Sequence, residues 1–300
     1  MIQIKQKKTK DYTVTELDLV CRKLTVLPDL SLYTNLLILS CHSNRLTSLS
    51  NLPPTLQKLQ CDNNLLTSLD HLPPNLQVLW CSYNQLARLG GAESAFGTSL
   101  PLNLQTLHCS HNQLTTLDNL PHTLQELWCL HNQLTSLDNL PLNLQILYCN
   151  KNQLTSLNNL PQNLQKLDCD ENQLTSLDNL PPNLQTLWCQ YNQITSLDNL
   201  PLTLRVLRCS CNQLTMLSFR GSDNYQLESA FGPNLQQLYC PTNNLTYFDI
   251  LPVTLQVLYC EENPIYTTCE EVYGFTLNRH TIKKYNEIKR MEKECCPILK

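Results

Sequence analysis

Aromatic and charged residues recur at a fixed spacing along this 300-residue chain. All three tryptophans (Trp80, Trp128 and Trp188) occupy the same place in a repeated unit of about twenty residues, and tyrosine, histidine, aspartate or arginine stands there in most other copies. Rings and charges in one row suit the binding of another molecule through ring contacts and ion pairs. The sequence contains no phosphate-binding glycine loop, zinc-protease motif or nucleophile elbow, so we expect no catalytic residues and no cofactor.

The repeated unit has a fixed pattern of leucine, cysteine, asparagine and proline. The copy that begins at Leu124 reads L-x-x-L-x-C-x-x-N-x-L-x-x-L-x-x-L-P, and Leu124 is its position 1. Twelve copies can be aligned; the first has Leu19 in place of the cysteine and Arg22 in place of the asparagine. We divide the chain into an N-terminal edge (1–13), the repeat array (14–265, with insertions at about 90–99 and 218–232) and a C-terminal helical cap or tail (266–300).

Each repeat predicts one short strand followed by an extended return. Positions 4 and 6 are apolar and alternate with variable positions 3, 5 and 7, which is the period of a strand. Stacked copies would form a parallel sheet, because one strand cannot bury its apolar face alone. The recurring proline leaves little room for helix on the returning side. A capping-box pattern at Thr268 predicts a short helix before Gly274, and residues 281–294 predict a second, basic helix.

This pattern resembles the leucine-rich repeat family, whose most regular segment is L-x-x-L-x-L-x-x-N-x-L. The short period and the Leu-Pro before each copy resemble the bacterial-effector class. The repeats, which are rich in Asn, Gln and Cys, are also similar to those of leucine-rich repeat proteins of giant amoebal DNA viruses. The resemblance implies an α/β horseshoe-type solenoid with a parallel sheet on its concave face and little helix on its convex side. Some such effectors carry a separate ubiquitin-ligase domain, for which the residues after the array are too few.

Side chains on the concave face are the candidates for binding a partner. Positions 5 and 8 carry all three tryptophans and five of the twelve tyrosines, and acidic residues of the eighth repeat lie beside them. The alternative is that the rings only stabilise one another across neighbouring strands, which is compatible with binding. The candidate residues are Trp80, Tyr83, His108, His111, Trp128, His131, Tyr148, Asp168, Asp170, Glu171, Trp188, Tyr191, Arg208, Tyr239 and Tyr259.

Charge narrows the class of partner. Residues 11–278 hold 10 basic and 22 acidic residues, a net charge of 10 − 22 = −12, within a chain of net charge −4. This sign argues against duplex nucleic acid, whose binding requires a basic surface. We expect a protein partner with a basic segment that carries apolar anchors. The alternatives are a substrate-recruiting subunit of a separate enzyme such as a ubiquitin ligase, and a single-stranded nucleic acid or glycan binder.

Eleven of the sixteen cysteines share position 6, where the strand period points them into the core. We interpret them as reduced packing residues, since buried thiols behave as small hydrophobic groups. No apolar run is long enough to span a membrane, and we expect a soluble protein of the cytoplasm, or of the host cytoplasm if the source is a virus. His111 and His131 stand at equivalent positions, but they have too few companions for a zinc site. The Cys295–Cys296 pair could be modified or oxidised.

Overall fold

The computed structural model describes residues 11–70, 72–89, 100–117, 119–219, 234–248, 251–252 and 254–295. The first predicted insertion, most of the second and Cys296 lie outside these residues. The chain divides into two units, which are described separately. The first comprises Met1–Leu114 with Asn119–Leu124, and the second comprises Thr115–Asp118 with Gln125–Lys300.

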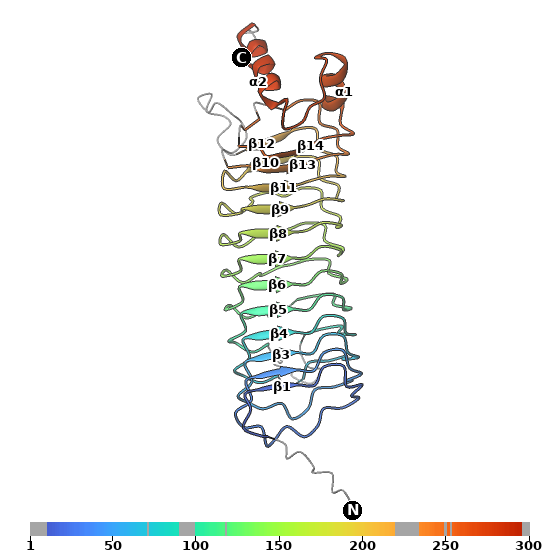
Figure 1. Cartoon of the computed structure of the whole chain (residues 1–300), viewed down its shortest axis with the longest axis vertical. Helices are drawn as coiled ribbons and strands as arrows, with labels where there is room; N and C mark the ends of the chain where they lie inside the picture. Colours follow the sequence, from blue (N-terminus) through green and yellow to red (C-terminus); the bar gives the residue numbers. More distant parts are fainter. Residues whose placement is uncertain are drawn as a thin grey trace, which may run out of the picture. The chain divides into compact units, whose positions relative to one another are not determined.

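Each repeat contributes one three-residue strand, as the sequence predicts, and twelve such strands lie in the described part of the chain. In each unit, neighbouring strands are parallel and follow chain order (Figure 1). The first unit holds β1 (Glu16–Asp18), β2 (Ile38–Ser40), β3 (Lys58–Gln60), β4 (Val78–Trp80) and β5 (Thr106–His108). The second holds β6 (Glu126–Trp128), β7 (Ile146–Tyr148), β8 (Lys166–Asp168), β9 (Thr186–Trp188), β11 (Val206–Arg208), β13 (Gln237–Tyr239) and β14 (Val257–Tyr259).

The returning side of the repeats contains no helix within the described residues between 14 and 263, as expected. One feature of this side was not predicted. In the second unit, β10 (Leu197–Leu200) and β12 (Leu217–Phe219) form a separate parallel pair, with Leu197 opposite Leu217. Two extended segments one repeat apart already lie side by side, so a small change in backbone angle is enough to pair them.

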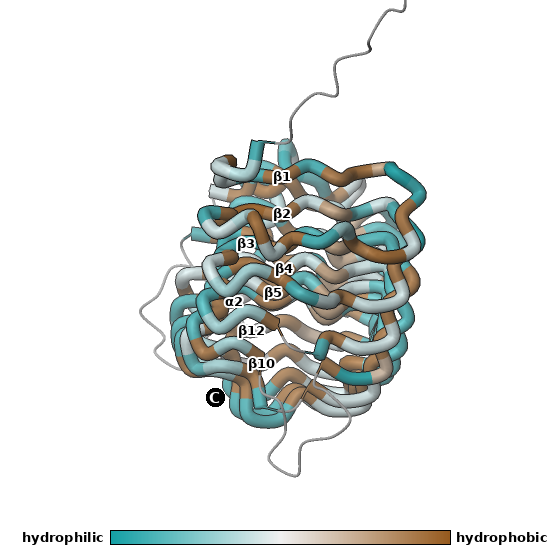
Figure 2. The backbone as a smooth tube through the Cα atoms, turned by 90° about the horizontal axis from the view of Figure 1, so that it is seen from below, coloured by the Kyte–Doolittle hydropathy of each residue, from teal (hydrophilic) through white to brown (hydrophobic). Residues whose placement is uncertain are grey.

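The core is built from the repeated leucines and the cysteine ladder. Leu127, Cys129 and Leu134 are fully buried, and the equivalent residues of the other coils repeat this arrangement. Apolar residues accordingly recur at matching places from coil to coil (Figure 2). The first repeat departs from this pattern: Leu17, in the middle of β1, stays partly exposed, because no coil precedes it among the described residues. The predicted register is correct there, since Cys21 lies outside the ladder and is exposed.

The asparagine ladder joins consecutive coils. Asn152 Nδ2 donates to the carbonyl oxygens of Cys129 (3.1 Å) and Cys149 (3.0 Å), and its Oδ1 accepts the backbone N–H of Leu134 (3.0 Å). One buried amide therefore satisfies backbone groups of two coils, as predicted from the sequence.

Position 8, just before the ladder asparagine (Arg22 in the first repeat), has a left-handed backbone in all twelve repeats, although none of them has glycine there. His131 (φ 56°) and Tyr191 (φ 52°) are examples. Such angles cost a non-glycine residue about 1–3 kcal/mol. A hydrogen bond to the next coil offsets the cost, since His131 N donates to Asn150 O (2.9 Å) and Tyr191 N to Ser210 O (3.0 Å). The position-8 side chains are thereby held just beyond the strand ends.

Two helices follow the last repeat. The second, α2 (Ile282–Cys295), matches the predicted range within one residue. The first, α1 (Pro264–Glu271), begins earlier than predicted from the capping box, because Asn263 is its N-cap and Pro264 opens its first turn. Thr268 lies inside the helix, where its hydroxyl donates to Pro264 O (2.9 Å). Neither helix of the described chain has the length and apolar character needed to cross a bilayer.

Candidate interaction surface

The residues at position 5 form a row along the outward face of the strands, which we call the aromatic row. In the strands that the repeats contribute, from β2 to β9 and in β11, β13 and β14, the middle residue is buried, so the residues on either side of it point outward. In the second unit the row lies in register from strand to strand. Its members there are Trp128, Tyr148, Asp168, Trp188, Arg208, Tyr239 and Tyr259.

In the first unit the predicted site residues form two stacked pairs. The rings of Trp80 and His108 are parallel (2°) with centroids 5.2 Å apart. Lys58, on the preceding strand β3, places its Nζ 4.5 Å from the centroid of the Trp80 ring. Tyr83 and His111, both at position 8, stack at 4.1 Å. The structure therefore brings these four candidates together as two neighbouring pairs.

In the second unit the row is a chain of ring contacts. Trp128 meets Tyr148 edge to face at 4.8 Å, and Tyr239 stacks on Tyr259 at 5.3 Å. Arg208 lies between two rings, with its guanidinium carbon 4.6 Å from Trp188 and 4.9 Å from Tyr239. The cross-strand stacking that we considered as an alternative to binding is thus present along the row.

Two rings of the row also approach each other over a carboxyl group. Tyr148 and Trp188 stand on β7 and β9, which are not neighbours, yet their centroids lie 6.4 Å apart. Asp168, on β8 between them, is only 7% exposed. The short aspartate side chain leaves room above itself, and the two larger rings lean inward over it.

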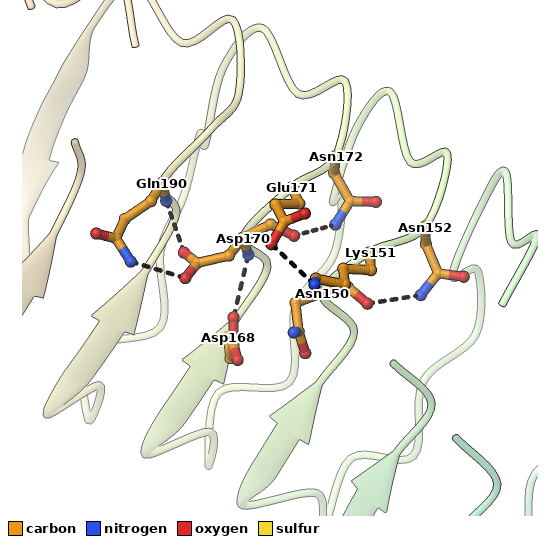
Figure 3. A network of polar contacts seen from close by, with 8 residues as sticks. All are labelled: Asn150, Lys151, Asn152, Asp168, Asp170, Glu171, Asn172 and Gln190. Atoms are coloured by element: carbon orange, nitrogen blue, oxygen red, sulfur yellow. Dashed lines mark hydrogen bonds and ion pairs between the residues drawn. The ribbon is translucent and has the colours of Figure 1, made fainter. Parts of the chain in front are cut away.

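The acidic residues of the eighth repeat have different hydrogen-bond environments (Figure 3). Asp168 Oδ1 accepts the backbone N–H of Asp170 (3.1 Å). Asp170 accepts both the backbone N–H (2.6 Å) and the side-chain Nε2 (2.9 Å) of Gln190. Glu171 pairs with Lys151 at 3.4 Å, and each of these two side chains is about half exposed (48% and 45%). Glu171 is therefore the accessible acid of the three.

Burial changes the ionisation of Asp168. It raises the pKa of this carboxyl from the ordinary value of 3.8 to about 7; the charge of Asp170 acts in the same direction and Arg208 opposes it. About half of the molecules therefore carry a proton on Asp168 at neutral pH. The pKa of Asp170 is also raised by burial, against the opposing effect of the hydrogen bonds from Gln190.

Asp170 also has a structural role that the sequence analysis did not assign. Asp62 is its equivalent in the third repeat, and Asp62 Oδ1 accepts the backbone N–H of Ser82 (2.9 Å) just as Asp170 accepts that of Gln190. At position 7, an aspartate thus caps the strand end of the following coil. The recurrence of aspartate at residues 62 and 170 is the signal that could have indicated this role.

The remaining candidates have more open positions. Tyr191 and Tyr83 are 59% and 56% exposed beyond the ends of β9 and β4, and Tyr259 is 49% exposed in the last strand. His108 and His111 belong to the first unit and His131 to the second. Within the described residues, no group of three or more His, Cys, Asp or Glu side chains is placed to hold a metal ion.

The cysteine ladder is buried throughout, and its thiols form no disulfide. Burial raises the pKa of Cys169 well above its ordinary value, and neighbouring ladder cysteines act in the same direction. A thiol held protonated in this way is a poor nucleophile. The ladder therefore contributes packing, as expected, and the exposed Cys21 and half-buried Cys211 are the accessible thiols among the described cysteines.

Comparisons with known proteins identify the repeat. A family model described as leucine-rich repeats (2 copies) matches residues 102–142 and 162–202. YopM from Yersinia enterocolitica WA-314 is 33% identical over 83% of this chain, with a TM-score of 0.71, and the match spans 56% of YopM. YopM from Yersinia pestis, described as a leucine-rich effector protein, is 27% identical over 83% of this chain and 78% of its own length, with a TM-score of 0.57.

A third similar structure is the functional domain of InlJ from Listeria monocytogenes, which is described as including a cysteine ladder. It is 29% identical over 82% of this chain and 58% of its own length, with a TM-score of 0.62. No protein of curated function matches the sequence.

Proposed function

The chain is a leucine-rich repeat protein that resembles the bacterial-effector class, and from this premise we propose that it is a non-enzymatic scaffold that binds a partner protein on its aromatic row. The observation that carries the proposal is the confinement of all three tryptophans to one outward strand position. The repeat itself requires leucine, cysteine and asparagine, and no ring at position 5 is needed for the coils to stack. Tryptophan and tyrosine are the residues that most often dominate binding energy at protein interfaces.

Ring stacking alone does not account for the row. A stacked pair on neighbouring strands contributes about 0.2–1 kcal/mol, which smaller aromatic or β-branched pairs would also supply. Two indole N–H groups, those of Trp80 and Trp188, are buried and have no acceptor in the described chain. Trp128 differs, since its Nε1 donates to Glu126 Oε1 at 2.7 Å. Buried donors are normally paired, so a partner's carbonyl oxygen on Trp80 or Trp188 would remove an energetic cost.

The charge of the surface indicates the partner's chemistry. Residues 11–278 carry an excess of twelve acidic residues (22 − 10), and Glu171 presents a carboxylate beside the row. A partner with a basic segment and apolar anchors would complement both the charge and the rings. Such a segment is consistent with an interaction protein and with a subunit that recruits substrates to a separate enzyme.

Protein is favoured over single-stranded nucleic acid or glycan by the arrangement of the rings. Binding of bases or sugars by stacking needs open ring faces. In this row Trp80 faces His108, Tyr239 faces Tyr259, and the remaining face of Tyr239 meets Arg208. The rings instead present their edges, which suit a peptide chain.

The free thiols favour a reducing compartment, and we place the protein in the cytoplasm. The cysteines whose side chains the structure describes form no disulfide, and Cys21 among them is exposed. An oxidising compartment would expose accessible thiols to disulfide formation. The test is to count free thiols on protein isolated from its native cell under alkylating conditions. A disulfide at Cys21 would contradict a cytoplasmic location.

The central experiment is capture of partners from the native cell by tagged protein, read by mass spectrometry. Replacing Trp128 and Trp188 together with alanine should abolish capture, while the midpoint of thermal unfolding of the second unit changes little. The matched control is Tyr247→Ala, which removes an exposed ring that lies outside the row. The proposed surface is wrong if the double variant recovers the same partners in the same amounts as the control.

A further inference from the structure

The aromatic row already holds one guanidinium group, that of Arg208, between two aromatic rings. Arg208 lies on β11, between Trp188 on β9 and Tyr239 on β13, and the guanidinium carbon is within 5 Å of both ring centroids (4.6 and 4.9 Å). The flanking rings thus come from the two strands on either side of the cation. Three consecutive strands are sufficient to form this sandwich.

Two strands earlier, a similar pair of rings flanks a central strand that carries no cation between them. Tyr148 on β7 and Trp188 on β9 are the flanking rings, and Asp168 on β8 stands where Arg208 stands in the complete sandwich. Strands two apart are separated by about 9.6 Å. A planar group needs roughly 3.5 Å on each side, so rings raised upright on these strands leave room for one. The 6.4 Å approach of the two rings shows that they lean into this space.

The floor of the space is the Asp168 carboxyl group, which makes no ion pair within the described part of the chain. It accepts the N–H of Asp170, and the guanidinium of Arg208 lies between its own two rings. The charges of Asp170 and Glu171 raise the pKa of Asp168, and that of Arg208 lowers it. The charged and titratable groups around it are Asp170 and Glu171 from its own coil, Tyr148 and Lys151 from the preceding coil, and Arg208 from β11.

We propose that an arginine side chain of the partner protein enters between Tyr148 and Trp188 and places its guanidinium over the Asp168 carboxylate. This rests on the proposed function of the aromatic row and names the chemistry that the row recognises. The rings contribute cation–π contacts and the carboxylate accepts the N–H groups of the guanidinium. An arginine fits better than a lysine, because its planar group matches the sandwich that Arg208 already occupies.

Binding of the arginine is coupled to the release of a proton from Asp168. The unoccupied site holds Asp168 with a raised pKa of about 7, so at neutral pH about half of the carboxyls must release their proton to solvent when the cation arrives. The affinity for arginine therefore increases as pH rises, by about tenfold between pH 6 and pH 8. Lowering the pH returns the proton, and the rings close over the neutral acid.

The test uses two capped peptides, acetyl-Leu-Arg-Leu-amide and the same peptide with citrulline in place of arginine. Citrulline keeps the shape of the side chain and removes its charge. We expect the arginine peptide to shift the indole N–H resonance of Trp188 in nitrogen-15 spectra, assigned with Trp188→Phe, and to leave that of Trp80 in place. The citrulline peptide should bind about tenfold more weakly at pH 8.

Two variants decide the outcome. Asp168→Asn should remove both the preference for arginine and its pH dependence, whereas Asp138→Asn, which removes an exposed charge away from the row, should retain both. Thermal unfolding of Asp168→Asn checks that it folds, and we expect no loss of stability at pH 7, since asparagine is neutral and nearly isosteric. Equal binding of the two peptides by the native protein, or an unchanged arginine preference in Asp168→Asn, would overturn the proposal.

The same variants separate this inference from the function on which it rests. Partner capture that is lost in the Trp128, Trp188 double variant but unaffected in Asp168→Asn would leave the aromatic row as the binding surface and remove the arginine site. Capture that survives in all of these variants would remove the proposed function itself. Loss of partner capture in Asp168→Asn, with capture retained in Asp138→Asn, supports both the proposed function and the arginine site.

Discussion

The hydroxyl of Tyr285 satisfies both backbone groups of Phe248: it accepts the N–H (3.0 Å) and donates to the carbonyl oxygen (2.7 Å). Asn286, the next residue of α2, does the same for Leu251, with distances of 2.9 and 2.8 Å. At the equivalent place in β10, Leu197 lies opposite Leu217 of the next coil. Two adjacent side chains of a helix therefore take the place of a thirteenth repeat.

Replacing Tyr285 with phenylalanine tests this cap. The ring still fills its buried position, but both hydrogen bonds between the hydroxyl and the Phe248 backbone are lost, and we expect a loss of about 1–3 kcal/mol in the free energy of unfolding of the last coils. Urea unfolding followed by hydrogen exchange in residues 245–260 measures it. Tyr247→Phe removes an exposed hydroxyl and should cost less than about 0.5 kcal/mol. Equal stability of the two variants would show that the hydroxyl is not the capping group.

Removing one member of the asparagine ladder should be more damaging. Asn152→Ala removes the acceptor of the buried Leu134 N–H and one of two amide donors to each of the Cys129 and Cys149 carbonyl oxygens, which keep Asn132 and Asn172 as donors. We expect a loss of about 3 kcal/mol or more in the free energy of unfolding, measured by urea denaturation. Gln153→Ala, one residue further and exposed, should change it by less than about 0.5 kcal/mol. A loss below about 1 kcal/mol in Asn152→Ala would mean that solvent replaces the amide.

The repeat explains which parts of this structure were predictable. Strand positions, the burial of Cys129 and the bridging by Asn152 each follow from a pattern present in nearly every copy, so the neighbours of a residue are known once the register is known. The same reasoning placed Leu19 in the ladder and Cys21 outside it. Periodicity of this kind constrains the backbone and the core, and in the structure both agree with it.

Features that depend on unique residues were not predictable in this way. The approach of Tyr148 to Trp188 requires a short side chain at 168 and spans two strands, so pairwise neighbour rules miss it. The start of α1 at Pro264 was misplaced because the last asparagine of the ladder also serves as an N-cap. The partner-binding role of the aromatic row stays a prediction, since the fold can form without it.

The cysteines should divide into two classes by reactivity. Among the cysteines whose side chains the structure describes, Cys21 is exposed and Cys211 half-buried, whereas Cys269 and the eleven ladder cysteines are buried. Burial raises the pKa of Cys269 and of ladder thiols such as Cys169. A maleimide at pH 7 should label Cys21 and Cys211 within minutes and the buried thiols only after unfolding. Peptide mapping by mass spectrometry distinguishes the sites. Labelling of Cys129 or Cys169 in the folded protein at a comparable rate would contradict the packed core.

The stability of the second unit should depend on pH through Asp168. Its pKa is about 7 in the folded chain and near its ordinary value of 3.8 after unfolding, so between these values the folded chain holds a proton that the unfolded chain has released. The contribution is fully present below about pH 4 and is lost as pH rises through about 7. At about 1.4 kcal/mol for each pKa unit, it amounts to at most about 4 kcal/mol.

The measurement is the difference in unfolding free energy between the native protein and Asp168→Asn, by urea denaturation from pH 4 to 8. Asp62 and Asp170 also have pKa values raised by burial and act in the same direction, but both variants share them, so the difference isolates Asp168. Relative to Asp168→Asn, the native protein should lose stability steadily as pH rises from 4 to 7 and change little above about pH 8. A difference that does not vary with pH would mean that Asp168 is ionised beneath the two rings, and that no proton is released when a cation binds.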